Sequence, residues 1–88
     1  MTDCLFCQIA SKEIPAQIVF ENDRLVAFRD LQPQAPTHIL VIPKRHISTL
    51  LDVSETDAQL LGQLQCAAVK VARSEGLING FRTVMNCL

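Results

Sequence analysis

The sequence predicts an α+β fold in which an antiparallel sheet carries one long helix and a short N-terminal helix. Two short apolar runs within residues 18–28 are separated by a turn pair, and a third at 37–42 follows a proline-punctuated loop. A long amphipathic stretch at 54–76 comes next. Three consecutive strands joined by short loops favour antiparallel pairing, and the apolar stripe of the helix can lie across one face of the sheet.

Length and composition exclude several classes of protein. With 88 residues, the chain is long enough for one small domain, at 1–88. Its 49% hydrophobic and 19% charged residues predict a folded core, and a net charge of −1 favours neither nucleic acid nor an anionic membrane as partner. No apolar run approaches the roughly 20 residues that span a bilayer, and no basic region opens the chain before an apolar stretch. We therefore expect a cytoplasmic protein.

The N-terminal part is expected to hold a short helix and two strands. Apolar residues at 5, 6 and 9 fit one or two helical turns within 4–10. Pro15 cannot continue a helix, so any helix before it ends ahead of this residue. Residues 18–21 have the character of a strand, and the Asn22-Asp23 pair is a hairpin turn leading into a second strand at 25–28.

A loop at 31–36 separates the second strand from the third. Its two prolines remove backbone donors and disfavour helix, so neither strand extends through it. Residues 37–42 are almost wholly apolar and half β-branched, as expected of a strand covered on both faces. Pro43 stops this strand. Polar side chains are thereby placed at or near strand ends, where a sheet can present chemistry: Asp30, His38 and His46.

The clearest helix begins at Ser54, a serine N-cap followed by acidic residues in the first turn. Apolar side chains then recur at three- and four-residue steps, at Leu61, Leu64, Ala68, Val71 and Ala72. Gly76 is the natural C-terminal cap, which gives a helix of about 20 residues. Residues 81–86 alternate apolar and polar side chains well enough to predict a fourth strand.

Four cysteines in a cytoplasmic chain favour thiols or metal ligands over disulfides. Cys4-x-x-Cys7 has metal-ligand spacing, and His46 is a candidate third ligand. Zinc in structural sites takes four ligands, so one position stays open. His38 is a candidate for that position, although a histidine inside a strand is more often buried and hydrogen-bonded in the core. Cys66 is expected to pack on the long helix, and Cys87 receives no role.

The segment from Asp30 to His46 resembles the histidine triad (HIT) nucleotide-binding family, in its Hint branch. The similarity extends through 12–16 and 80–86, and so over nearly the whole chain. It implies the family's α+β fold, with four of its five strands present here. The family's His-x-His-x-His segment, which would follow 81–86, has no counterpart before Leu88. We therefore expect a HIT domain that is truncated at its C-terminus.

The resemblance also implies a nucleotide site. Asp30 matches a carboxylate that binds ribose hydroxyls, and Asn86 matches an asparagine close to the phosphate. The apolar walls around the purine and its sugar match Ile14, Phe28 and Leu31. Position 29, often histidine in the family, is arginine here. The residues alone also allow other roles: a turn-capping aspartate at 30, a strand-end asparagine at 86, and ordinary core residues at 14, 28 and 31. No glycine-rich phosphate loop is present, so the nucleotide site depends on the resemblance.

Family members hydrolyse nucleoside 5′-phosphoramidates through a triad histidine that attacks the α-phosphorus. The resemblance implies a purine nucleoside monophosphate or phosphoramidate as ligand, with no catalytic residue among those present. It further implies zinc held by Cys4, Cys7, His46 and a triad histidine, and a homodimer formed through the long helix and 81–86. Three interpretations stay open: a shortened enzyme, a nucleotide-binding or dimerising remnant without turnover, and a small zinc-held interaction domain.

Overall fold

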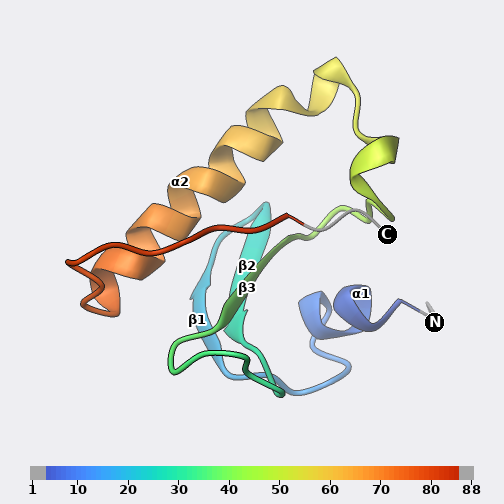
Figure 1. Cartoon of the computed structure of the whole chain (residues 1–88). Helices are drawn as coiled ribbons and strands as arrows, with labels where there is room; N and C mark the ends of the chain where they lie inside the picture. Colours follow the sequence, from blue (N-terminus) through green and yellow to red (C-terminus); the bar gives the residue numbers. More distant parts are fainter. Residues whose placement is uncertain (1–3, 86–88) are drawn as a thin grey trace.

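The computed structural model describes residues 4–85 (Figure 1). Its α-helices are α1 (Leu5–Ala10) and α2 (Ala58–Ser74), and its 3₁₀ turns are η1 (Leu50–Asp52) and η2 (Glu55–Asp57). The strands are β1 (Ile18–Glu21), β2 (Leu25–Arg29) and β3 (Ile39–Pro43). The predicted α+β class, with an antiparallel sheet, one long helix and one short helix, is confirmed.

The sheet has the order β1-β2-β3, and both neighbouring pairs are antiparallel. Asn22 builds the turn between β1 and β2, because its Oδ1 accepts hydrogen bonds from the backbone N–H groups of Arg24 at 2.8 Å and Leu25 at 3.0 Å. This local bonding is why asparagine is favoured in turns. The register shifts between Ile18 and Phe20, which gives β1 a bulge-like irregularity.

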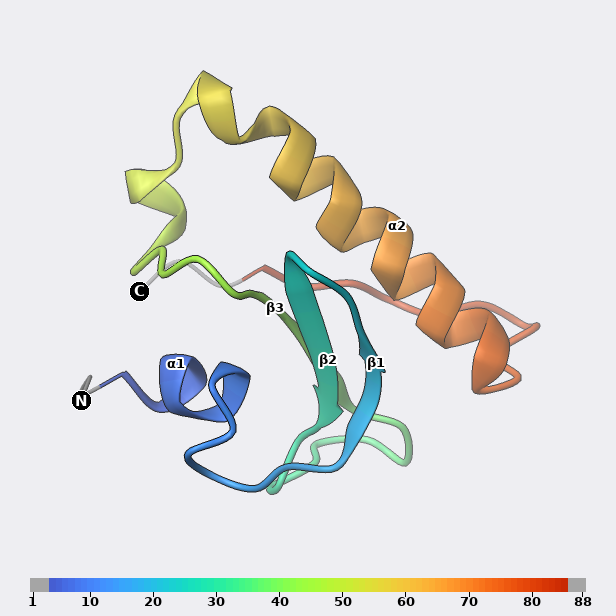
Figure 2. The same ribbon diagram turned by 180° about the vertical axis from the view of Figure 1, so that it is seen from behind.

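The core is centred on β2, the middle strand. Residues 25–28 are no more than 2% exposed. Figures 1 and 2 show α2 across one face of the sheet and α1 on the opposite side, so β2 is covered from both directions. The expectation of double coverage for 37–42 was wrong. The strand there starts at Ile39 and is half-buried throughout, because it lies at the edge of the described sheet.

The end of α2 follows the capping signal in the sequence, whereas its start is later than predicted: Ser54 precedes the 3₁₀ turn η2, and the α-helix begins at Ala58. The Ser54 N–H donates to Asp57 Oδ2 at 3.0 Å across η2, and α2 continues from there. The Asp57 carboxylate also pairs with Arg45, so it ties the start of the helix to the chain leaving β3. Beyond Ser74, Gly76 has a φ of 75°, the left-handed conformation that commonly ends a helix and suits glycine.

The buried face of α2 agrees in part with the predicted stripe. Its buried residues are Leu60, Ala67, Val71 and Ala72, so the prediction included Val71 and Ala72 but not Leu60 or Ala67. The predicted Leu61, Leu64 and Ala68 are half-buried. One residue turns a helix by about 100°, so these three side chains lie on or beside the margin of the buried face. No helix within residues 4–85 has the length and apolar character needed to cross a membrane.

No strand forms at residues 81–85, contrary to the prediction of a fourth strand at 81–86. All of these residues are exposed, with Phe81 at 49% and Val84 at 66%. Alternation alone does not make a strand, because strand stability depends on cross-strand neighbours. The sheet of the described part therefore has three strands. Asn86 and Cys87, singled out from the sequence, lie outside the described residues.

Candidate functional site

Asp30 follows the last residue of β2 and holds the loop that begins there. Its backbone N–H donates to the His38 carbonyl at 3.0 Å, which extends the pairing of β2 with β3. One side-chain oxygen, Oδ1, accepts from the Gln32 N–H at 2.9 Å. The other, Oδ2, lies 3.5 Å from His38 Nε2. A carboxylate has about four acceptor positions, so Asp30 caps the turn and still has lone pairs for a ligand.

His38 lies beside Asp30 and not in the core, so the expectation of a buried strand histidine was wrong. Its side chain is 29% exposed. Its Nδ1 accepts from the Gln34 N–H at 2.9 Å. In the neutral ring the proton then sits on Nε2, which faces the Asp30 carboxylate. The Gln34 N–H of the loop needs an acceptor, and its hydrogen bond to Nδ1 holds the imidazole at this edge of the sheet.

The apolar residues near Asp30 differ widely in exposure. Phe28 is 2% exposed, and its ring packs at 6.4 Å between centroids against Phe6 of α1. Ile14 is half-buried, whereas Leu31 is 76% exposed. Because side chains alternate along a strand, Phe28 and Asp30 belong to the same face, the one toward α1. That face joins an apolar floor to a carboxylate.

Arg29 belongs to the opposite face and is tied to α2. Its guanidinium binds both carboxylate oxygens of Glu75, the residue capping the end of α2, at 2.8 and 2.9 Å. The hydrogen bond from Glu75 raises the pKa of Arg29. The pair joins positions that are 46 residues apart, and no local pattern in the sequence indicates it. Arg29 is therefore directed away from the face that carries Asp30.

The predicted metal ligands converge between α1 and the chain leaving β3. The ligand atoms of Cys4, Cys7 and His46 all lie within 4.8 Å of one another, with Cys7 Sγ and His46 Nδ1 at 3.1 Å. Cys4 caps α1, and its Sγ accepts from the Cys7 N–H at 3.4 Å. That backbone hydrogen bond is the main cause that lowers the pKa of the Cys4 thiol. A lower pKa favours the thiolate, which is the form that binds metals.

This donor set fits a zinc ion. Thiolate and imidazole are the usual zinc ligands, with bonds of about 2.0–2.3 Å, so a small contraction of the cluster would close it around one ion. His46 Nε2 lies 2.9 Å from Ser48 Oγ, and such a partner fixes the orientation of a ligand ring. Ser48 was not predicted, although it lies two residues beyond His46. His38, the candidate fourth ligand, is not in the cluster found among residues 4–85.

Comparison with protein families matches nearly the whole chain to one domain. The family model described as scavenger mRNA decapping enzyme C-term binding covers residues 3–87. Among curated proteins, the purine nucleoside phosphoramidase of Escherichia coli is 46% identical over 85 residues, which is 96% of this chain and 71% of that protein. Protein HitA of Neisseria gonorrhoeae is 43% identical over 86 residues, 98% of this chain and 80% of that protein.

Solved structures give the same result. A HIT family hydrolase from Legionella pneumophila Philadelphia 1 has a TM-score of 0.94 and 52% identity, over 97% of this chain and 77% of that one. A histidine triad protein from Clostridium difficile has a TM-score of 0.94 and 42% identity, over 99% and 76% of the two chains. The sequence comparisons and the structural comparisons both cover nearly the whole of this chain. The chain belongs to the histidine triad (HIT) family.

Proposed function

We propose that this chain binds purine nucleoside monophosphates and related nucleoside phosphoramidates at the face formed by Phe28 and Asp30. The observation that carries the proposal is the 46% identity to a purine nucleoside phosphoramidase over 96% of the chain. The position of Asp30 supports it, because a carboxylate at the end of a strand offers acceptors at the rim of the sheet.

Each part of the nucleotide has a proposed partner. The free lone pairs of Asp30 accept hydrogen bonds from the ribose hydroxyls. Leu31, which is 76% exposed, covers the base or sugar from the loop, and the half-buried Ile14 provides an apolar floor that the buried Phe28 supports from the core. The resemblance to the family makes Asn86, which lies outside the described residues, the proposed partner of the phosphate. Recognition of this kind places the nucleoside by hydrogen bonds and burial, without a glycine-rich loop around the phosphate.

The test is a titration with adenosine monophosphate of the wild type, Asp30→Asn and Glu55→Gln. The amide oxygen introduced by Asp30→Asn still accepts from the Gln32 N–H, so the turn survives while the charged ribose acceptor is lost. Loss of a hydrogen bond to a charged group costs about 1.5–3 kcal/mol, so we expect affinity to fall roughly ten- to a hundredfold.

Glu55→Gln also replaces a carboxylate by an amide, at an exposed residue of η2 outside the face of Phe28 and Asp30, and should leave the affinity unchanged. Nucleotide binding that is equally strong in Asp30→Asn and the wild type would remove the basis of the assignment.

We also propose that Cys4, Cys7 and His46 hold zinc in a structural role, which supports a zinc-held interaction domain as the second candidate function. The 4.8 Å cluster supports this proposal. An ion bound there would fix α1 to the chain after β3 and leave one coordination position for a ligand outside the cluster.

We propose further that the chain forms a homodimer through α2 and residues 81–85. The half-buried Leu61 and Leu64 of α2 and the exposed Phe81, Val84 and Met85 support this, because apolar surface of this kind is typical of an interface. Light scattering at micromolar concentration should give twice the chain mass of 9.8 kDa. A monodisperse monomer would contradict the proposal.

A further inference from the structure

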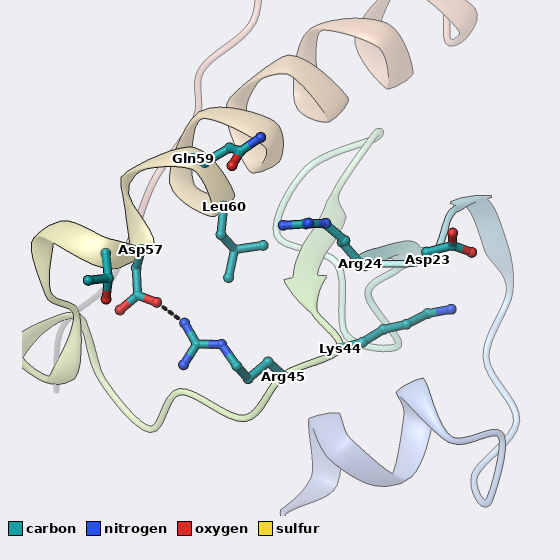
Figure 3. A pocket seen from close by; sticks show the side chains of 8 residues that line it. Asp23, Arg24, Lys44, Arg45, Asp57, Gln59 and Leu60 are labelled. Atoms are coloured by element: carbon teal, nitrogen blue, oxygen red, sulfur yellow. Dashed lines mark hydrogen bonds and ion pairs between the residues drawn. The ribbon is translucent and has the colours of Figure 1, made fainter.

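Two adjoining hollows lie at the end of the sheet that is remote from Asp30. One, of about 420 Å³, lies between the β1–β2 turn, the residues after β3 and the start of α2 (Figure 3). The other, of about 440 Å³, lies between the same turn and the middle of α2. Asp23 and Arg24 line both. The length of β2 separates them from the face proposed for the nucleotide.

Positive charge gathers around these hollows, although the chain as a whole has a net charge of −1. The cationic residues that line them are Arg24, Lys44, Arg45 and Lys70. The acidic ones are Asp23 and Asp57. Their surroundings therefore attract anions even though the molecule overall does not.

The cations differ in how far they are already neutralised. Arg45 pairs with Asp57, and Lys44 pairs with Glu21 at 2.9 Å. The Lys70 Nζ lies 5.2 Å from the centre of the Phe20 ring.

Among residues 4–85, the Arg24 guanidinium has no ion pair and no hydrogen bond. Figure 3 shows its side chain extended toward Leu60 and the first turn of α2. Five donors and a full charge are thus directed into the first hollow without a partner.

A second unsatisfied group lies at the edge of the other hollow. The amide oxygen of Gln63 is buried and has no hydrogen-bond partner among the described residues. A buried amide normally finds a partner, so this one indicates that a water molecule or a ligand group completes the site. The same amide carries two N–H donors that can face the hollow when it turns over.

We propose that these hollows bind a phosphoryl oxyanion, supplied either by inorganic polyphosphate or by the phosphate tail of a nucleoside polyphosphate. Arg24 provides the planar fork that matches two phosphate oxygens, and Lys44 and Arg45, which are paired with Glu21 and Asp57, place further N–H donors beside it. Thr56 and Gln59 offer polar side chains on the helix side of the first hollow. The site is independent of the nucleotide face at Asp30.

The test maps amide chemical shifts of the 88-residue chain during titration with tripolyphosphate at low salt. We expect shifts at residues around Arg24, Lys44 and Gln63, and none around Asp30. Arg24→Gln should weaken binding about tenfold, because it removes one charge-assisted bidentate contact. Arg24→Lys, which keeps the charge without the fork, should fall in between. Arg73→Gln makes the same change on the exposed last turn of α2 and should bind as the wild type does.

Adenosine triphosphate and adenosine distinguish the two sources. Shifts around Arg24 with tripolyphosphate and the triphosphate support a site for either source, and shifts with the triphosphate alone identify a nucleoside polyphosphate. Adenosine should leave Arg24 unaffected.

Equal weakening by Arg24→Gln and Arg73→Gln would show diffuse attraction and overturn the proposal. The absence of shifts around Arg24 with both phosphates, while the wild-type spectrum is that of a folded chain, would overturn it as well. Asp30→Asn, tested in parallel, should leave tripolyphosphate binding intact.

Discussion

Asp30 has more acceptor capacity than its neighbours use. The Gln32 N–H occupies one position of Oδ1, and His38 Nε2 lies 3.5 Å from Oδ2. These contacts orient the carboxylate without exhausting it, so a ligand would meet an acceptor whose direction is already set. Orientation before binding reduces the entropy cost of association, which is why a turn-capping role and a ligand-binding role at one aspartate are compatible.

The metal cluster gives the sharpest test for single residues. We expect Cys7→Ser to abolish stoichiometric zinc binding, because it removes one of three ligands. Cobalt substituted for zinc should show thiolate-to-metal absorption in the wild type and lose it in the variant. Cys66→Ser is the matched control, since Cys66 is an exposed thiol on α2, outside the cluster. Equal metal content in the two variants would contradict a site at Cys4, Cys7 and His46.

Glu21 connects three elements at the end of β1. Its carboxylate accepts from Lys12, just after α1, at 2.6 Å and pairs with Lys44, just after β3, at 2.9 Å. These two ammonium groups, Lys12 first, lower the pKa of Glu21. Lys12 has a φ of 69°, which is uncommon for a residue other than glycine. The residue that forms the ion pair with Glu21 therefore also has the left-handed backbone conformation, just after α1.

The stability that Glu21 contributes should be lost in acid. A carboxyl with a lowered folded-state pKa contributes stability that is fully present above its unfolded pKa, about 4.3, and is lost as pH falls through the folded value. The free energy of unfolding, measured with urea, should therefore be higher for the wild type than for Glu21→Gln at neutral pH, and the two should converge as pH falls through the folded-state pKa of Glu21.

Glu55→Gln, at an exposed residue without an ion pair among those described, should show a difference that depends less on pH. A Glu21→Gln difference that stays constant over the whole range would contradict the linkage.

The elements with strong local signals were predictable. β1 has the predicted limits, because the Asn22 turn bounds it on one side, and α2 ends before Gly76 as predicted. Ser54 precedes the 3₁₀ turn η2, so α2 starts later than its capping signal indicated. The buried face of α2 was predicted in part, because apolar residues occupy adjacent positions such as Leu60 and Leu61. Residues 81–85 alternate like a strand and form none, since a strand depends on a partner that local pattern does not supply.

The candidate sites also differ in how far local sequence could predict them. The pair Cys4 and Cys7 is local, and the resemblance to the HIT family indicated His46 as the next ligand, so the three residues were predicted as a set. The contact of Arg29 with Glu75 and that of Arg24 with its hollow depend on how the helix lies over the sheet. Sequence spacing does not determine that geometry. The position of His38 depends on one backbone N–H in the loop, at Gln34, which a residue pattern does not reveal.

For the 88-residue chain, we predict no steady-state hydrolysis of an adenosine phosphoramidate. Its two histidines are at 38 and 46. His38 is held between Asp30 and Gln34, and His46 between Cys7 and Ser48, so neither is a free nucleophile facing a bound phosphorus. Loss of a covalent nucleophile leaves at most about 10³–10⁴-fold acceleration in a well-studied hydrolase.

The purine nucleoside phosphoramidase of Escherichia coli is the positive control for this assay. Multiple turnovers by a homogeneous 88-residue preparation, abolished by His38→Ala, would overturn the prediction and make His38 the nucleophile.

The contact between Cys7 and His46 spans 39 positions and has a consequence for the order in which the molecule opens. Amides exchange with solvent through local openings whose free energies differ along a chain. α1 is a helix of six residues whose one buried residue is Ile9. It packs on the sheet through Phe6 and is joined to the chain after β3 by this contact, so its amides should exchange well before those of β2. An ion bound by the cluster must be released before α1 can separate. Hydrogen exchange at residues 5–10 would then slow with metal while β2 kept its own rate, so the N-terminal helix would report occupancy of the cluster.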